Sequence, residues 1–305
     1  AQQHRGQESA GIVSVDDAGD IHDHRGMGLV PDIFEEKDLQ ALPGTIAVGH
    51  VRYSTTGRPS IANAQPLLVN HKGMNIAIAH NGNLVNTFEL RSRLEDEGAI
   101  FRGTSDTEVI MPLLVRALAH HDPVEAIRRT CQQLRGAYCL IFLRGRLMVA
   151  VRDPYGFHPL CYGKREDGIY VVASESCALD SIGASFDRDV RPGELIVVDE
   201  SGERVMESGI NPDASKCALC VFEHIYFARP DSVIDGQSVY QARLEAGRIL
   251  ARSHPVQADL VIGVPDSGLA AAIGFAQESG IPYGEGLVKN RYIGRTFIQP
   301  TQNGR

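Results

Sequence analysis

The order of strand-like and helix-like segments is the feature of this sequence that most limits the folds open to it. In the first two thirds of the chain, two sets of short apolar segments, each bounded by Gly or Pro turns, lie on either side of helix-like segments. Helices bracketed by two antiparallel strand sets favour an α+β layered domain over a doubly wound sheet. The expected strands span residues 11–15, 45–51, 74–80, 138–143, 147–151, 169–173 and 194–199.

Three helices are expected between the two strand sets. The first spans residues 84–97 and places Leu84, Phe88 and Leu94 on one apolar stripe. The second begins within residues 104–106, and the third begins at Asp122, a capping residue followed by a first-turn proline.

A polar stretch over residues 208–216 predicts a domain boundary, which we set between residues 212 and 213. The domains are then 1–212 and 213–305. The second domain has an expected helix over 238–252, a buried-type strand over 260–264, a small-residue turn and a helix over 269–277. Strand, turn and helix in this order open a parallel α/β unit. About 90 residues are short for a complete domain of that kind, so we expect its first part.

The composition argues against two classes of partner. The chain has 305 residues, with 38 Asp and Glu against 30 Lys and Arg, which gives a net charge of −8. Proteins that bind nucleic acid or anionic membranes need a surplus of cations. No apolar run reaches the roughly 18 residues of a membrane span. A small phosphorylated ligand needs only a local cradle, so this class of ligand stays open.

Six cysteines in a chain of this length do not indicate a disulfide framework, so a reducing cytoplasm is the expected compartment. Four of them lie in apolar segments and are expected in the core. Cys217 and Cys220 have a spacing found among metal ligands, but one such pair is equally consistent with a structural role.

Polar residues at the ends of expected strands predict a binding cleft. Arg52 can hold a carboxylate through a two-pronged contact and Asp106 can hold an ammonium, so together they fit the amino-acid end of a zwitterion. The Asn81 amide and the backbone N–H of Gly82 can donate two hydrogen bonds to an oxyanion. Such a pocket suits acyl transfer from the side-chain amide of an amino acid.

A plainer interpretation of the same residues stays open on pattern alone. His80, Asn81 and Gly82 can form a turn in which Asn and Gly adopt left-handed geometry. In that case Arg52 forms an ion pair at the end of its strand.

A second ligand site is indicated by the turn over residues 264–268. Backbone amides at the start of a helix attract phosphate, and Gly268 permits close approach. Downstream, Lys289, Arg291 and Arg295 lie in a segment that fits a phosphate-binding loop, although a solvated basic loop explains it equally well.

Several motifs together resemble those of the amidophosphoribosyltransferase family, and the resemblance covers essentially the whole chain. The first group consists of QHRGQESAG (3–11), GHVRYST (49–55), HNGNL (80–84), TSDTE (104–108) and ASES (173–176). Some of these also fit other class II glutamine amidotransferases, such as glucosamine-6-phosphate synthase. The segments that resemble the amidophosphoribosyltransferase family specifically are FEHIYFARPDS (222–232), VPDSG (264–268) and KNRYIGRTFIQPTQ (289–302).

The resemblance implies an α+β N-terminal-nucleophile (αββα sandwich) glutaminase domain followed by the first part of an α/β phosphoribosyltransferase domain. In the family, glutamine is hydrolysed to glutamate and ammonia. The ammonia then displaces pyrophosphate from phosphoribosyl pyrophosphate to give phosphoribosylamine for purine synthesis. Carried over by position, Arg52, Thr55 and Asp106 bind glutamine, and Asn81 and Gly82 form the oxyanion hole.

The resemblance also assigns residues of the second domain. Ser267 lies by the complex of phosphoribosyl pyrophosphate with Mg²⁺, and Lys289, Arg291 and Arg295 belong to the loop that closes over it. One branch of the family carries a [4Fe-4S] cluster, for which Cys220 occupies the place of one ligand. The other three ligands belong to a region beyond these residues. A homotetramer with feedback inhibition by purine nucleotides is the family expectation.

The sequence departs from the family pattern at both ends. The family nucleophile is a cysteine at the mature N-terminus, whose own α-amino group acts as base with a pKa near ~8. This chain begins with Ala1 instead, and a later paired-aspartate motif is missing. An internal span of an enzyme is the leading hypothesis, and a glutamine sensor without a nucleophile is the alternative. An upstream Cys-Gly-Ile favours the enzyme, whereas a start codon just before Ala1 favours the sensor.

We expect these 305 residues by themselves to catalyse neither half-reaction, because they contain neither the N-terminal nucleophile nor the paired aspartates. The measurement is glutamate release from glutamine by the purified chain. Release well above that of a buffer blank would contradict this expectation.

Overall fold

The computed structural model describes residues 1–53, 57–200, 202–207 and 217–290. The chain forms two compact units. Among the described residues, the first unit lies within 2–160 and 190–219, and the second within 161–189 and 220–290. The predicted boundary between residues 212 and 213 lies outside the described residues, so it stays a prediction.

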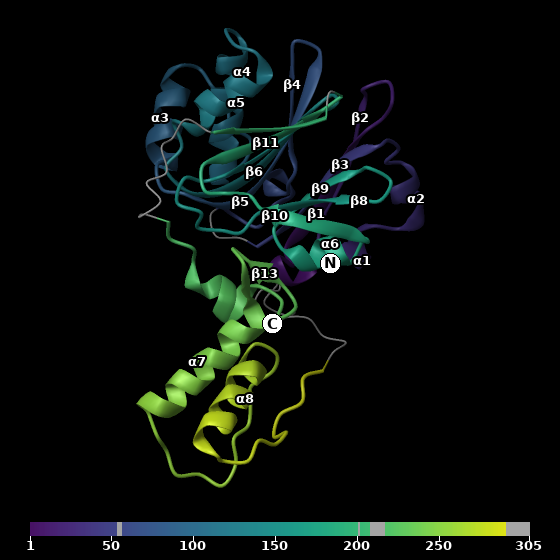
Figure 1. Ribbon diagram of the computed structural model, residues 1–305. Coiled ribbons are helices and arrows are strands. Elements are labelled where there is room, and N and C mark those ends of the chain that lie inside the picture. The colour runs from purple at the N-terminus through teal and green to yellow at the C-terminus, as the bar shows by residue number, and fades with distance from the viewer. Residues whose placement is uncertain (54–56, 201, 208–216, 291–305) are drawn as a thin grey trace. The chain divides into compact units, whose positions relative to one another are not determined.

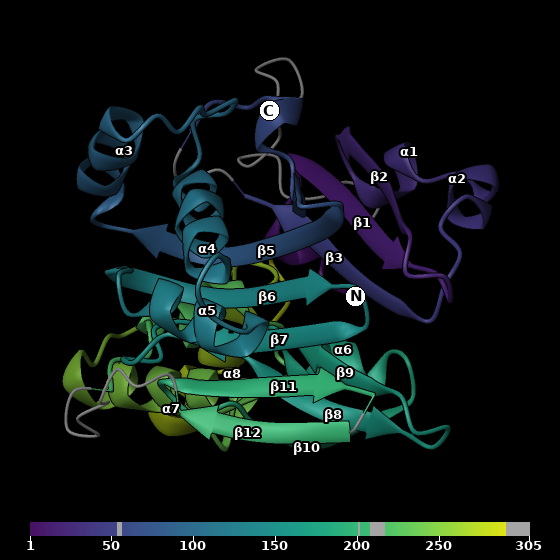
Figure 2. The same cartoon turned by 90° about the horizontal axis from the view of Figure 1, so that it is seen from above.

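A six-stranded antiparallel sheet is the centre of the first unit (Figure 2). Its order is β12-β11-β7-β6-β5-β4, and all neighbours pair antiparallel. The strands are β4 (Leu67–His71), β5 (Met74–Leu84), β6 (Gly136–Arg144), β7 (Leu147–Arg152), β11 (Glu194–Asp199) and β12 (Gly202–Glu207).

Three helices cover one face of this sheet: α3 (Thr87–Asp96), α4 (Ile110–Leu118) and α5 (Pro123–Cys131) (Figure 2). The layer between them and the sheet is the main core, and its side chains are almost completely shielded from water. The side chain of Asp122 accepts hydrogen bonds from the N–H groups of Val124 and Glu125, which confirms the predicted start of the third helix.

A three-stranded antiparallel sheet packs on the other face, in the order β2-β1-β3. It contains β1 (Ser9–Val15), β2 (Ile21–Met27) and β3 (Ile46–Arg52), and two short helices follow β2, α1 (Val30–Ile33) and α2 (Glu36–Gln40). A second core lies between the two sheets and is made by Val13, Val15, Val48, Ala77, Ala79 and Leu143. The predicted α+β layering is therefore confirmed.

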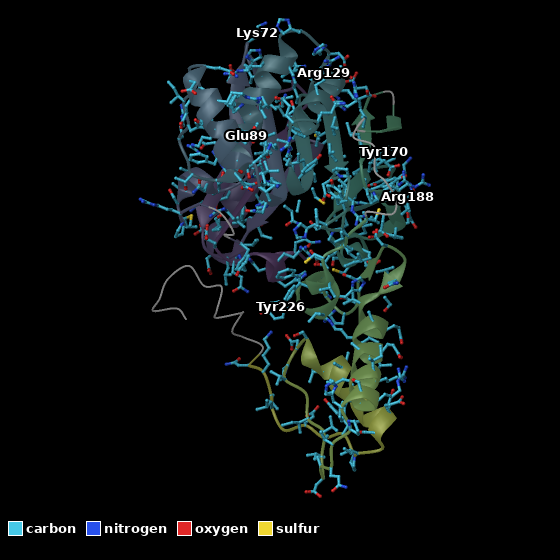
Figure 3. The ribbon with its side chains drawn as sticks, turned by 90° about the vertical axis from the view of Figure 1, so that its left-hand side faces the viewer. Lys72, Glu89, Arg129, Tyr170, Arg188 and Tyr226 are labelled. Carbon is cyan, nitrogen blue, oxygen red and sulfur yellow. The ribbon has the colours of Figure 1, made fainter. Side chains whose placement is uncertain are left out.

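The second unit contains a smaller sheet and a helix pair. The sheet has the order β10-β8-β9, and Tyr170 and Arg188 mark its two edge strands, β9 and β10 (Figure 3). The elements of this unit are β8 (Cys161–Arg165), β9 (Tyr170–Ala173), α6 (Ser176–Asp180), β10 (Ala184–Asp189), β13 (Val233–Ile234), β14 (Gln237–Ser238), α7 (Val239–Ser253) and α8 (Gly268–Ser279).

Helices α7 and α8 lie side by side at very short range (Figure 1). A Cβ atom on Gly247 would lie 1.9 Å from the carbonyl oxygen of Ala271, and one on Gly274 would lie 1.9 Å from that of Leu244. Each helix therefore contributes one glycine that lets the two backbones meet. In the part of the chain that the structure describes, no helix is long and apolar enough to cross a membrane.

Two details of the prediction are wrong. Residues 260–264 form no buried strand: Val261 makes a single parallel bridge to Tyr283, and Val264 is 66% exposed. A buried strand needs partners on both sides, and the described residues provide one short neighbour. Phe88 does not share a buried stripe with Leu94, because α3 begins at Thr87 and leaves Phe88 88% exposed in its first turn.

A buried carboxylate joins the two sequence segments of the second unit. Glu175 is buried, and its Oε2 accepts hydrogen bonds from the backbone N–H of Arg229 (2.9 Å) and from the hydroxyl of Ser232 (2.8 Å). Next to it, the hydroxyl of Ser176 accepts from the N–H of Val233 (2.9 Å). Because a buried charge is tolerated only with such partners, these contacts fix segment 229–233 against the start of α6.

We expect Glu175→Ala to lower the free energy of unfolding by about 2–4 kcal/mol, since it leaves the buried Ser232 hydroxyl and the partly buried N–H of Arg229 without their charged acceptor. The measurement is urea unfolding of the chain, followed by circular dichroism. Glu166→Ala, at an exposed position in the turn between β8 and β9, is the matched control. Equal unfolding midpoints for the two variants would contradict the role given to Glu175.

Candidate functional site

The cleft residues predicted from the sequence lie in the first unit at one end of β5. Asn81 and Gly82 belong to β5 itself, where they are opposite Cys139 and Tyr138 of β6. They form part of a regular strand pair, so the interpretation of this motif as a turn is wrong.

Two features of this pair bear on chemistry. The Asn81 Nδ2 is buried and has no hydrogen-bond partner among the described residues. A Cβ atom on Gly82 would lie 2.1 Å from the carbonyl oxygen of Ala137 and 2.8 Å from His80 Nε2, so only glycine fits there. The end of β5 therefore combines a buried, unused amide donor with a tightly constrained glycine.

Asp106 is held directly against this strand. It begins the 3-10 turn Asp106–Val109, and its Oδ2 accepts a hydrogen bond from the backbone N–H of Leu84 (2.9 Å). Its Oδ1 accepts from the N–H of Thr107 (3.0 Å). The structure thus brings Asp106 to the same strand end as Asn81 and Gly82, although they are more than 20 residues apart in sequence.

Arg52 ends β3 and is buried. Its Nη1 donates to Glu8 Oε1, so the expected ion pair at this strand end is present. Burial lowers the pKa of Arg52, and the nearby carboxylate of Asp106 acts in the opposite direction. Glu8 therefore orients the guanidinium, and the carboxylate-binding role of Arg52 stays a prediction.

A buried polar network that the sequence did not single out surrounds His80. The N–H of His80 donates to Gln65 Oε1 (2.6 Å), and His80 Nδ1 lies 3.0 Å from the hydroxyl of Thr107. Gln65 Nε2 also donates to that hydroxyl (3.2 Å). Burial lowers the pKa of His80, and Asp106, 4.0 Å away, opposes this effect. We expect a neutral imidazole that positions Thr107 and, through it, Asp106.

Asp153 holds the neighbouring strand of this pair. It is fully buried, and its carboxylate accepts hydrogen bonds from the N–H groups of Tyr155 (2.9 Å), Phe157 (3.2 Å) and Tyr138 (3.3 Å). Tyr138 is the residue opposite Gly82. Asp153 thus supports the β6 side of the strand pair that carries the predicted oxyanion hole.

The predicted second site lies in the second unit. Ser267 is the N-terminal cap residue of α8, and its side chain makes no capping hydrogen bond. Lys289 Nζ lies 2.5 Å from Asp266 Oδ2, and both groups are accessible to solvent. Thr55, Arg291 and Arg295 lie outside the described residues.

All six cysteines are free thiols, and four of them are buried as expected: Cys131, Cys139, Cys161 and Cys177. Burial raises the pKa of Cys131 to about 12 and that of Cys177 to about 11, so both stay protonated at neutral pH. Cys217 is exposed and Cys220 half-buried. Over the described ranges, no three His, Cys, Asp or Glu side chains are grouped so as to hold a metal ion.

Comparison with known proteins identifies relatives along the whole length of this chain. A family model described as a glutamine amidotransferase domain matches residues 50–181. The amidophosphoribosyltransferase of Archaeoglobus fulgidus is 53% identical over 99% of this chain and 65% of its own length. That of Methanocaldococcus jannaschii is 50% identical over 100% of this chain and 67% of its own length.

Solved structures agree with these relatives. The glutamine phosphoribosylpyrophosphate amidotransferase of B. subtilis, solved with ADP and GMP, is 44% identical with a TM-score of 0.89. The match covers 99% of this chain and 64% of that one. Together the comparisons confirm the predicted fold class: an α+β N-terminal-nucleophile glutaminase domain followed by part of an α/β phosphoribosyltransferase domain.

We expect Gly82→Ala to lower the free energy of unfolding by about 1–3 kcal/mol, because its Cβ would overlap the backbone of β6. Gly49→Ala on β3 is the control, since a Cβ there meets its nearest atom at 3.7 Å. Urea unfolding of both variants checks this. A Gly82→Ala chain as stable as Gly49→Ala would show that the close approach to Ala137 does not constrain β5.

Proposed function

Because the chain belongs to the amidophosphoribosyltransferase family, we propose that the gene product containing it converts glutamine and phosphoribosyl pyrophosphate to phosphoribosylamine, glutamate and pyrophosphate. This is the first committed step of purine synthesis. The chain spans 65% of the length of the Archaeoglobus relative and 64% of the B. subtilis structure. The observation that carries the proposal is the buried Asn81 amide beside Gly82 and Asp106, for which the described part of the chain offers no hydrogen-bond partner.

Glutamine would be held at its amino-acid end by Arg52, Thr55 and Asp106. The guanidinium of Arg52 attracts the α-carboxylate, and Asp106 attracts the α-ammonium. Both charged side chains are buried, which strengthens their interaction with a zwitterion because little water screens it. The partners that fix them, Glu8 for Arg52 and Leu84 N–H for Asp106, support this role because they orient both groups before glutamine arrives.

The side-chain amide of glutamine would be attacked next to Asn81. We propose that Asn81 Nδ2 and the backbone N–H of Gly82 donate hydrogen bonds to the oxygen on which negative charge develops. A donor aimed at such an oxygen contributes about 10²–10³ in rate. Leaving a buried amide without a partner costs stability, so its presence here supports a role that is fulfilled only with ligand.

The nucleophile would come from outside these residues. In the family it is a cysteine at the mature N-terminus, and Ala1 has no thiol. Burial keeps Cys131 and Cys177 protonated, which makes them unsuitable as attacking groups. Cys217 and Cys220 have no α-amino group free to act as base. We therefore propose that the attacking thiol is the family's N-terminal cysteine rather than any of these four.

The phosphoribosyl half of the reaction would use the start of α8. Its backbone amides can donate hydrogen bonds to a pyrophosphate group. The Ser267 hydroxyl can do so as well, because it caps no helical N–H. The oxygens of Ser267 and Asp266 are ligands of the kind that Mg²⁺ prefers, so the residues present fit this ion. When bound, Mg²⁺ would neutralise charge on the departing pyrophosphate. Lys289, Arg291 and Arg295 would supply the cations of the closing loop.

The remaining proposals concern regulation, compartment, oligomeric state and the iron–sulfur cluster. The B. subtilis relative binds ADP and GMP, which supports feedback by purine nucleotides. Six free thiols are typical of a cytoplasmic protein. A homotetramer follows from the family pattern, and a domain boundary between residues 212 and 213 follows from the polar stretch over residues 208–216. For a [4Fe-4S] cluster the described residues offer Cys220 as one thiolate, which does not make a site, so no step is assigned to it.

We expect Asn81→Ala in the complete gene product to lower kcat of the glutamine-dependent reaction by about 10²–10³, because one oxyanion donor is lost. Activity with ammonia supplied directly should persist, since it bypasses glutamine hydrolysis. Asn75→Ala, at the exposed opposite end of β5, is the control. Equal loss of both activities, or full glutamine-dependent activity, would contradict the role of Asn81.

A further inference from the structure

Asn63 connects two segments that flank the glutamine site, although no motif drew attention to it. It ends the 3-10 turn Ile61–Asn63 and is 1% exposed. One of the two segments begins at Gly57 and follows the strand that ends in Arg52. The other, residues 102–105, leads directly into Asp106.

The side chain of Asn63 uses its full hydrogen-bonding capacity between these segments. Its Oδ1 accepts from the backbone N–H groups of Thr104 (2.9 Å) and Ser105 (3.2 Å). Its Nδ2 donates to the carbonyl oxygen of Arg58 (2.8 Å) and to the hydroxyl of Thr104 (3.0 Å). An amide side chain offers two donors and two acceptor positions, so no other residue type reproduces this pattern at the same size.

The Thr104 hydroxyl completes the connection. It also accepts a hydrogen bond from the backbone N–H of Arg58 (3.0 Å), so the same oxygen contacts both Asn63 and the first segment. Gly103 makes room for the Asn63 side chain, because a Cβ there would lie 2.4 Å from Asn63 Oδ1.

The segment before Asp106 is also fixed from its opposite side. Glu108 Oε1 accepts hydrogen bonds from the N–H groups of Arg102 (2.6 Å) and Gly103 (2.7 Å). Arg91 Nη2 donates to the carbonyl oxygen of Gly103 (2.9 Å). With these contacts in place, Asn63 and the Thr104 hydroxyl together set how far residues 104–105 lie from the segment that begins at Gly57.

We propose that Asn63, acting with the Thr104 hydroxyl, is a positioning residue for glutamine binding: it sets the place of the Asp106 carboxylate relative to the chain that follows Arg52. The inference rests on the proposed function, in which Arg52 and Asp106 bind the two charged groups of glutamine. Asn63 touches the backbone of Ser105, the residue immediately before Asp106. Loss of its contacts therefore moves the carboxylate rather than removing it.

A displaced Asp106 affects bound glutamine and the transition state alike, because the α-ammonium does not change during the reaction. Such a loss of uniform binding raises KM and leaves kcat nearly unchanged. This separates the role of Asn63 from that of an oxyanion donor, whose loss lowers kcat.

The first test uses Thr104, whose side chain is exposed, so its substitution does not threaten the fold. In the complete gene product, Thr104→Val removes the hydroxyl that joins Asn63 to Arg58, and Thr104→Ser keeps it. We expect Thr104→Val to raise KM for glutamine about tenfold at nearly constant kcat, while Thr104→Ser keeps the original KM. Equal KM values for the two variants would overturn the proposal.

The second test uses Asn63→Asp, which keeps the two acceptor contacts and loses both donors. Asn70→Asp is the matched control, because its amide makes one exposed hydrogen bond, to Asn75. We expect a raised KM for glutamine in the first variant only, with ammonia-dependent activity retained in both. A parallel fall of both activities would indicate a general folding defect and overturn the proposal. Absence of glutamine-dependent activity in the unsubstituted protein would instead contradict the proposed function.

Discussion

The pairing of β5 with β6 is the interaction on which the rest of the first unit depends. Along β5, Ile76 and Ile78 face the core under the helices, whereas Ala77 and Ala79 face the core between the sheets. A shift of one residue would exchange these faces and remove both cores. The same register puts Gly82 opposite Tyr138, so the packing of the fold and the place of the predicted oxyanion hole are set by one pairing.

This register is fixed at the site by polar groups rather than by apolar packing. Asp106 holds the N–H of Leu84 at the end of β5, and Asp153 holds the N–H of Tyr138 on β6. Each is a buried carboxylate that accepts at least two backbone hydrogen bonds, which compensates its removal from water. Because such networks are costly when incomplete, they define one arrangement of the strand ends more sharply than apolar contacts do.

The sequence predicted features whose causes are local. Asp122 followed by Pro123 identifies a helix start because cap and helix are neighbours, and the apolar run over residues 138–143, bounded by Gly136 and Gly145, identifies a strand. The supporting roles of Asp153 and Asn63 were not predicted, because their hydrogen-bond partners lie up to 42 residues away in the sequence. In addition, a buried Asp or Asn has the same sequence signature as one in a surface turn. The polar pattern and the motif resemblance both predicted Arg52, Asn81 and Asp106, but the contact of Arg52 with Glu8 and those of Asp106 with Leu84 and Thr107 required the fold.

The two predicted sites differ in how their charged groups are held. In the first unit, Arg52 and Asp106 are buried and bonded to fixed partners, so the site has its geometry before a ligand arrives. In the second unit, Lys289 and Asp266 form an exposed ion pair, which contributes little stability in water. Pyrophosphate is a stronger ion-pair partner for Lys289 than a single carboxylate is. In the same way, Mg²⁺ is a stronger partner for Asp266 than a lysine ammonium group is. We therefore expect the proposed glutamine site to be preorganised, whereas the proposed phosphoribosyl site takes its final geometry when the ligand replaces these partners.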